Sequence, residues 1–185
     1  MAERLAYLLD RLGRAVHNLQ FTDGLNPAQW GALRFISRAK PATCKPSALA
    51  DYLCTTKGTI SQTLKSLEIK GYIRKIAETK DRRVVRLVLT EAGRVMLTRD
   101  PLWHLEAAAA EMSDEITTAT RVLSQYVKKL QGECGFKPFG VCPECGHFSG
   151  NICGQEGVPR CGLTGEPIAA REIEQICETF LSATN

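Results

Sequence analysis

The sequence has no long hydrophobic run. Nowhere in its 185 residues is there a stretch close to the roughly 18 apolar residues that a membrane-spanning helix needs. The N-terminus, Met1-Ala2-Glu3-Arg4, lacks the basic segment and the hydrophobic segment of a secretion signal. We therefore expect a soluble, cytoplasmic protein. With 44% hydrophobic residues, the chain can bury one main core and leave room for a small second module.

Catalytic motifs are also missing from the sequence. The three histidines, His17, His104 and His147, lie far apart along the chain. There is no glycine-rich loop of the kind that binds phosphate, and no nucleophile is accompanied by a recognisable partner motif. We therefore expect that the chain is not an enzyme.

Charge and cysteine are distributed unevenly. Residues 1–130 carry 21 basic and 13 acidic side chains, whereas residues 131–185 carry 3 and 7. Residues 40–99 alone hold 13 basic and 5 acidic side chains, a balance that suits a polyanion such as DNA. Six of the eight cysteines lie between Cys134 and Cys177, which favours metal ligation over disulfides in a chain without a secretion signal. We expect a main domain over 1–130 and a cysteine-rich module over 131–185.

Hydrophobic periodicity predicts a mainly α fold with a small β-hairpin. Apolar residues recur at helical spacing in five segments and alternate in two shorter ones, which predicts helices over 3–20, 27–39, 46–53, 57–70 and 102–130 and strands over 72–76 and 84–89. A further helix is predicted to begin at Thr90. Two short helices joined by a tight turn and followed by a hairpin with a charged tip are typical of a winged helix-turn-helix.

The second short helix carries a polar face that can read DNA. In a helix-turn-helix this helix enters the major groove, where hydroxyl and amide groups pair with base edges and lysines neutralise phosphates. The candidate DNA-binding residues of this face are Thr56, Lys57, Thr59, Ser61, Gln62, Thr63, Lys65 and Ser66. The hairpin tip adds Lys80, Arg82 and Arg83, where a guanidinium can enter the minor groove.

Four segments together resemble the MarR family of winged-helix regulators: LNPAQWGALRFI, SALADYL, TTKGTISQTLKSLEIKGYIRK and DRRVVRLVLTEAG. The resemblance covers roughly residues 5–130. It implies a homodimer that binds a pseudo-palindromic operator in double-stranded DNA, with Arg82 in the minor groove and Asp81 orienting the wing tip. It also implies sensing of a small-molecule effector or of cysteine oxidation, although the sequence identifies no ligand.

Two apolar stripes fit a dimer independently of that resemblance. Residues 5–19 carry a leucine stripe, and residues 102–130 carry an apolar heptad pattern over most of four heptads. Such long patterns usually meet another helix. The alternative is that they form an ordinary core within one chain.

The tail contains a pattern of cysteines that is typical of a metal site. Cys142 and Cys145 form a C-x2-C knuckle beside proline and glycine, which presents two thiolates to one metal. For the other two ligands we favour Cys161 and Cys177, with Cys153 in reserve and His147 as a substitute. We expect Cys177 to lie on the apolar face of a terminal helix that contains Ile173 and Leu181.

The cofactor of this module is predicted to be Zn2+ or an iron–sulfur cluster. Zinc is favoured because the C-x2-C knuckle is typical of zinc sites, and because a module of about 50 residues is too small for its own core and needs a bound metal to stabilise it. All-thiolate ligation also fits a cluster, which would make the tail a redox or iron sensor. Free or disulfide-linked cysteines are the third alternative. If a metal binds, it is expected to set the geometry of the helix that ends near Leu130.

Two cysteines, Cys44 and Cys54, lie in the DNA-binding half. Cys54 precedes the second short helix and would be a redox switch if exposed, although burial as a small apolar residue is the favoured interpretation. The sequence as a whole predicts a dimeric, sequence-specific transcription regulator, most simply a repressor, whose tail couples metal or redox state to DNA binding. The alternative is a metal-stabilised adaptor that mediates protein contacts without specific DNA binding.

Overall fold

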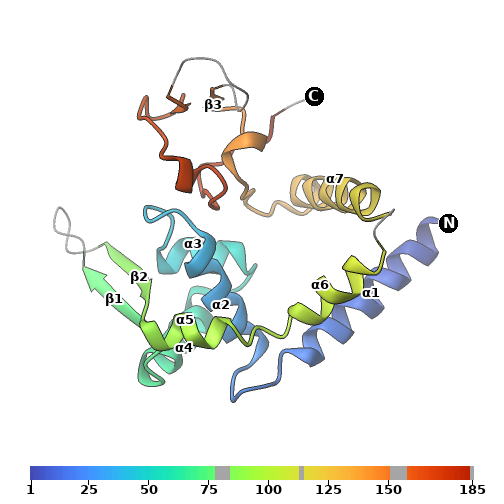
Figure 1. The fold of residues 1–185 in the computed structure, drawn as a ribbon, viewed down its shortest axis with the longest axis horizontal. Coiled ribbons are helices and arrows are strands. Elements are labelled where there is room, and N and C mark those ends of the chain that lie inside the picture. Colours follow the sequence, from blue (N-terminus) through green and yellow to red (C-terminus); the bar gives the residue numbers. More distant parts are fainter. Residues whose placement is uncertain (78–83, 113–114, 151–157, 184–185) are drawn as a thin grey trace.

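The computed structural model describes residues 1–77, 84–112, 115–150 and 158–183. The described chain is mainly helical with a small hairpin, as the sequence predicts (Figure 1). The helices are α1 (Ala2–Leu19), α2 (Pro27–Arg38), α3 (Pro46–Tyr52), α4 (Lys57–Ile69), α5 (Glu91–Leu97), α6 (Trp103–Ala110) and α7 (Ile116–Cys134). The strands are β1 (Ile73–Ala77), β2 (Val85–Leu89), β3 (Phe148–Ser149) and β4 (Arg160–Cys161), and short 3-10 turns cover Cys142–Glu144 and Ala170–Glu172.

Helices α2 to α5 and the β1–β2 hairpin form one lobe with a shared hydrophobic core. Helix α2 packs against α4, β2 and α5, and α3 packs against α4. Trp30, Leu33 and Phe35 of α2 are completely buried, and they meet Leu64 and Leu67 of α4 in this core. The lobe has the arrangement of a winged helix-turn-helix, which confirms the predicted fold class.

Local sequence signals define the ends of the helices in this lobe. Asn26 begins α2 with a capping box, in which its side chain accepts from the Gln29 backbone N–H and the Gln29 side chain accepts from the Asn26 N–H. Gly71 follows α4 with φ +76°, a conformation that costs glycine little. Gly93 has another reason to lack a side chain, because a Cβ there would collide with the carbonyl oxygen of Tyr72.

The wing is an antiparallel hairpin whose register runs from Ile73 opposite Leu89 to Ala77 opposite Val85. Ile73, Leu87 and Leu89 face the core and are buried, so the alternating pattern of β2 fixes which face of the wing meets the lobe. The backbone N–H of Leu87 also donates to the carbonyl of Cys44 at 2.8 Å. The root of the wing is thereby tied to the loop that precedes α3.

Helices α1, α6 and α7 extend away from the lobe (Figure 1), and none of their residues is buried. The single helix predicted over 102–130 is wrong, because the structure has α6 and α7 there as separate helices. The apolar heptad pattern continues across the break and so could not reveal it. No helix in the described ranges is long and apolar enough to cross a membrane.

The tail after α7 folds into a loop-rich module. Gly135 ends α7 in the left-handed region at φ +67°, and β3 pairs with β4. The predicted terminal helix around Cys177 is wrong. The backbone of this segment pairs with other parts of the chain instead: Ile176 N donates to Arg38 O, and Cys177 N donates to Gly140 O, each at 2.9 Å.

Candidate nucleic-acid interface and thiol cluster

Helix α4 presents the exposed polar face expected of a recognition helix. Thr56 caps the helix and accepts from the Thr59 backbone N–H at 3.1 Å. Ile60, Leu64 and Leu67 are buried against the core, which forces the opposite face outward. The candidate DNA-binding residues that the structure leaves exposed are Thr56, Lys57, Thr59, Ser61, Gln62 and Lys65.

Two residues assigned to that face from the sequence are less exposed than the others. Thr63 is buried, and its hydroxyl donates to the Thr59 carbonyl at 3.0 Å. Ser66 is half-buried, and its hydroxyl accepts from Gln29 Nε2 at 2.8 Å. Both hydroxyls make hydrogen bonds inside the lobe, so the structure gives less support to base reading by Thr63 and Ser66 than by the exposed residues, and their assignment stays a prediction.

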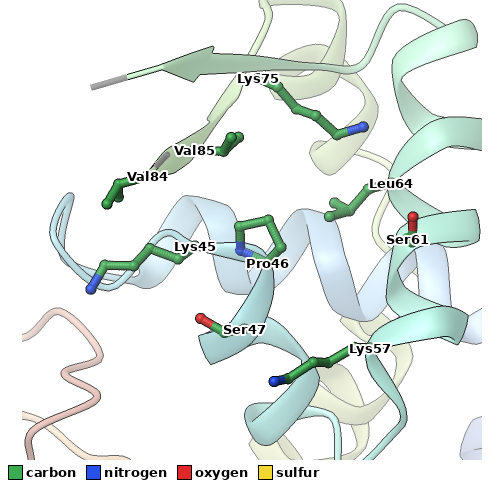
Figure 2. Close-up of a pocket in the computed structure, with 9 residues that line it drawn as sticks. All are labelled: Lys45, Pro46, Ser47, Lys57, Ser61, Leu64, Lys75, Val84 and Val85. Carbon is green, nitrogen blue, oxygen red and sulfur yellow. The ribbon is translucent and has the colours of Figure 1, made fainter. Parts of the chain in front are cut away.

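A cavity of about 450 Å³ lies between α3, α4 and the wing. Figure 2 shows its lining, which includes lysines from three different elements: Lys45, Lys57 and Lys75. Ser47 and Ser61 add hydroxyl groups. Lys45, Ser47 and Lys75 were missed from the sequence. The signal that pointed to the two lysines was the excess of basic residues over 40–99, and none pointed to Ser47, because periodicity cannot show that a loop, a helix and a strand converge.

Lysines around this cavity are partly engaged by carboxylates. Lys75 Nζ lies 2.9 Å from Glu68 Oε2, and Lys45 Nζ lies 2.7 Å from Glu178 Oε1 of the tail. Ammonium groups and hydroxyls between a recognition helix and a wing are suited to the phosphate backbone of a duplex. The predicted wing-tip residues Lys80, Arg82 and Arg83 lie outside the described residues.

The structure gathers the four favoured tail cysteines around one small cavity. Cys142, Cys145, Cys161 and Cys177 all line a space of about 20 Å³. Lys40 of the lobe and His147 line it as well. In the described ranges no three His, Cys, Asp or Glu side chains are already placed as a group that could hold a metal ion. Cys153, the reserve ligand, lies outside the described residues.

Polar groups lie beside three of the sulfur atoms of this thiol cluster, by which we mean Cys142, Cys145, Cys161 and Cys177. Lys40 Nζ lies 3.1 Å from Cys142 Sγ, and the backbone N–H of Leu181 donates to Cys145 Sγ at 3.5 Å. The Thr179 hydroxyl lies 3.2 Å from Cys177 Sγ.

The electrostatics of the cluster favour a thiolate and an ammonium. Burial acts to raise the pKa of Cys161, but hydrogen bonds from the backbone of Thr164 and Leu163, together with the charge on Lys40, lower it below its ordinary value. Burial likewise acts to lower the pKa of Lys40, but the hydrogen bond and charge of Cys142 raise it above its ordinary value. These donors are the surroundings that a thiolate ligand requires.

The cysteines of the lobe differ from each other. Cys44 is buried, and this burial raises the pKa of its thiol to about 11. Cys54 is exposed and has φ +49°, so the favoured sequence interpretation, burial of Cys54, is wrong. All seven cysteines in the described part of the chain are free of disulfides.

The tail packs directly on the lobe. Ile176 forms a parallel bridge with Ala39, and the Lys40 backbone N–H donates to the Ile176 carbonyl at 2.9 Å. Phe139 lies against Phe35 and Tyr52, with ring centroids 6.3 and 5.3 Å away. The thiol cluster is therefore in contact with the loop that connects α2 to the helix-turn-helix.

Comparison with known proteins points to one family. A family model described as "MarR family" matches residues 23–84, and no curated protein matches the chain.

A solved structure of FabT from Streptococcus pneumoniae, in complex with DNA, is 23% identical with a TM-score of 0.58, covering 71% of this chain and 99% of FabT. A MarR/EmrR family transcriptional regulator from Acinetobacter sp. ADP1 is 21% identical with a TM-score of 0.57, covering 72% and 94% of the two chains. CouR from Rhodococcus jostii RHA1, bound to p-coumaroyl-CoA, is 22% identical with a TM-score of 0.52, covering 70% and 91%.

Proposed function

We propose that this chain is a sequence-specific DNA-binding transcription regulator, and specifically a repressor, because its lobe is a winged helix-turn-helix and residues 23–84 match the MarR family model. The observation that carries the proposal is the exposed polar face of α4 beside the lysine-lined cavity. Gln62 is exposed at the middle of α4, where a side-chain amide can pair with an adenine edge. Lys45, Lys57 and Lys75 stand where the phosphate backbone would pass between α4 and the wing.

We propose that the active form is a homodimer built by α1 and α7. Helix α1 exposes Leu5, Leu8, Leu12 and Leu19, and α7 exposes Val122, Leu123, Val127 and Leu130. A single chain leaves these apolar faces uncovered, which weighs against their forming a core within one chain. Two copies of the lobe would then present two α4 helices to the two halves of a pseudo-palindromic operator.

A gel-shift titration tests the DNA-binding proposal. The probe is the duplex upstream of the protein's own coding sequence, titrated in parallel with an unrelated duplex of equal length. We expect binding of the upstream duplex in the range of about 10⁻⁸ M or tighter, weakening steeply with salt. Equal, micromolar binding of both duplexes would contradict the proposal and favour an adaptor that binds proteins instead.

We further propose that the thiol cluster binds one zinc ion through Cys142, Cys145, Cys161 and Cys177. The small size of the cavity, about 20 Å³, favours one ion over an iron–sulfur cluster of several iron and sulfide ions. Four thiolates would leave a zinc site with two negative charges, and the Lys40 ammonium, 3.1 Å from Cys142 Sγ, lies where it offsets part of that charge.

Metal content and colour test this assignment directly. Protein purified without oxygen is expected to be colourless and to contain about one zinc ion per chain, with tetrahedral sulfur coordination by X-ray absorption. Brown protein that contains iron and sulfide would show that these cysteines bind an iron–sulfur cluster instead of zinc. Protein without bound metal would overturn the site.

A further inference from the structure

Glu178 of the tail is bound to the DNA-binding lobe by its side chain and by its backbone. Its carboxylate accepts from Lys45 Nζ at 2.7 Å, and it lies 3.5 Å from Lys137 Nζ. Its backbone N–H donates to Thr43 Oγ1 at 3.2 Å. The Glu178 side chain is only 17% exposed, so its pairing with Lys45 is screened less by solvent and salt than a pair on the open surface.

Lys45 lines the DNA-facing cavity, but its ammonium group forms an ion pair with the Glu178 carboxylate of the tail. It lines the cavity together with Lys57 and Lys75. Figure 2 shows that its ammonium group points away from Lys75 and Ser61. A lysine held in this way by a carboxylate does not neutralise a DNA phosphate, and Glu178 adds a negative charge beside the path of the backbone.

The residue before Glu178 belongs to the thiol cluster. Cys177 lines the same small cavity as Cys142, and its backbone N–H donates to the Gly140 carbonyl at 2.9 Å. A metal ion bound by both cysteines would fix this strand-like segment at Cys177. The position of the Glu178 carboxylate would be fixed with it, one residue further along the chain.

We propose that the tail is a metal-dependent restraint on DNA binding, in which Glu178 withholds Lys45 from the phosphate backbone while the thiol cluster is filled. This inference rests on the DNA-binding and zinc-binding functions proposed above. Loss of the metal loosens Cys177, releases the Glu178–Lys45 pair and frees Lys45 for one phosphate contact in each lobe. The metal-loaded protein is thus the weaker DNA binder of the two states.

The expected size of the effect follows from counterion release. Each phosphate that is neutralised steepens the dependence of log K on log salt by about 0.9. The two lobes of a dimer therefore steepen this dependence by about 1.8. Between 50 and 200 mM salt, the affinity of the protein with Lys45 released then falls by a factor of about 12 more than that of the protein with Lys45 withheld. Because phosphate contacts do not depend on sequence, a fluorescein-labelled duplex of arbitrary sequence is a sufficient probe.

The experiment compares the full, metal-loaded wild-type chain with Glu178→Gln by fluorescence anisotropy over this salt range. Glu178→Gln keeps the shape of the side chain and removes its charge. We expect tighter binding at 50 mM salt and a slope steeper by about 1.8. Treatment of the wild type with a zinc chelator is expected to produce the same increase in affinity and the same steeper slope. Treatment of Glu178→Gln with the chelator is expected to change neither quantity further.

Matched variants separate this mechanism from a general change in charge. Glu174→Gln changes the charge equally at an exposed position of the tail and is expected to leave the slope near that of the wild type. In Lys45→Gln, the effect of Glu178→Gln should disappear. Equal slopes for wild type and Glu178→Gln, equal effects of Glu174→Gln and Glu178→Gln, or a chelator effect that persists in Glu178→Gln would each overturn the proposal.

Failure of this inference is distinguishable from failure of the proposed functions. If the wild type binds its upstream duplex specifically but the slopes of wild type and Glu178→Gln agree, the regulator stands and the restraint is wrong. If no form of the protein binds the upstream duplex more tightly than the arbitrary one, specific DNA binding itself is wrong.

Discussion

Arg34 Nε donates a hydrogen bond to Asp100 Oδ2 at 2.7 Å, and the two side chains are only 15% and 20% exposed. The same guanidinium donates from Nη2 to Gln20 Oε1 at 2.8 Å. Arg34 lies in α2, Gln20 follows α1, and Asp100 precedes α6. One half-buried arginine therefore joins α2 of the DNA-binding lobe to the end of α1 and to the segment that leads into α6.

We expect Arg34→Met to lower the free energy of unfolding by about 2 kcal/mol, because a charged hydrogen bond is lost and Asp100 is left largely buried without its partner. Urea denaturation measures the change. Arg14→Met is the matched control, since its pair with Asp10 is exposed, and its unfolding midpoint should stay at the wild-type value. A stability equal to the wild type in Arg34→Met would show that Arg34 does not hold this junction together.

Gln62→Ala is expected to weaken binding to the upstream duplex by about 1 to 3 kcal/mol and to relax the preference for one base pair in each half-site, because an amide that pairs with a base edge is lost. A gel-shift series with single base-pair changes measures both effects. Thr63→Ser is the control, since Thr63 is buried and the hydroxyl is retained. A loss of affinity in Thr63→Ser as large as that in Gln62→Ala would contradict the assignment of the base-reading face.

Val127→Glu is expected to convert the dimer into monomers, because it places a charge on an exposed apolar face of α7 that we propose to be covered by a second copy. Val127 is 52% exposed in the single chain. Sedimentation velocity measures the change in mass. Leu163→Glu, at a tail residue that is also 52% exposed, should leave the dimer intact. A wild-type protein that already sediments as a monomer would contradict the dimer proposal.

Cys142→Ser combined with Cys145→Ser is expected to abolish metal binding and to lower the stability of α7 without dissociating the dimer. The tail contacts α7 through Glu144, whose Oε2 lies 3.1 Å from Lys128 Nζ, so loosening the knuckle removes a support from that helix. Metal analysis and thermal unfolding followed by circular dichroism measure the two effects. Cys54→Ser, in the lobe, should retain both the metal and the stability. If the double variant loses its metal while its thermal unfolding is unchanged, the tail does not support α7.

The sequence alone determined the local elements of the lobe, because their signals are local. The capping residues Asn26 and Thr56, the glycine after α4 and the alternating pattern of β2 act through neighbours in the chain, and the structure places each as expected. The spacing of the tail cysteines likewise selected the four that line one cavity. These features need only periodicity and the geometry of a few consecutive residues.

The tertiary structure decided the burial and long-range contacts that periodicity in the sequence does not indicate. Thr63 and Ser66 share the polar character of their neighbours, but packing of α2 against α4 buries them to different degrees. The segment around Cys177 has the apolar spacing of a helix, yet its backbone groups pair with Arg38 and Gly140. The pairs of Lys40 with Cys142 and of Lys45 with Glu178 join residues more than a hundred positions apart. Such contacts depend on how the tail docks on the lobe, and no local pattern in the chain encodes that.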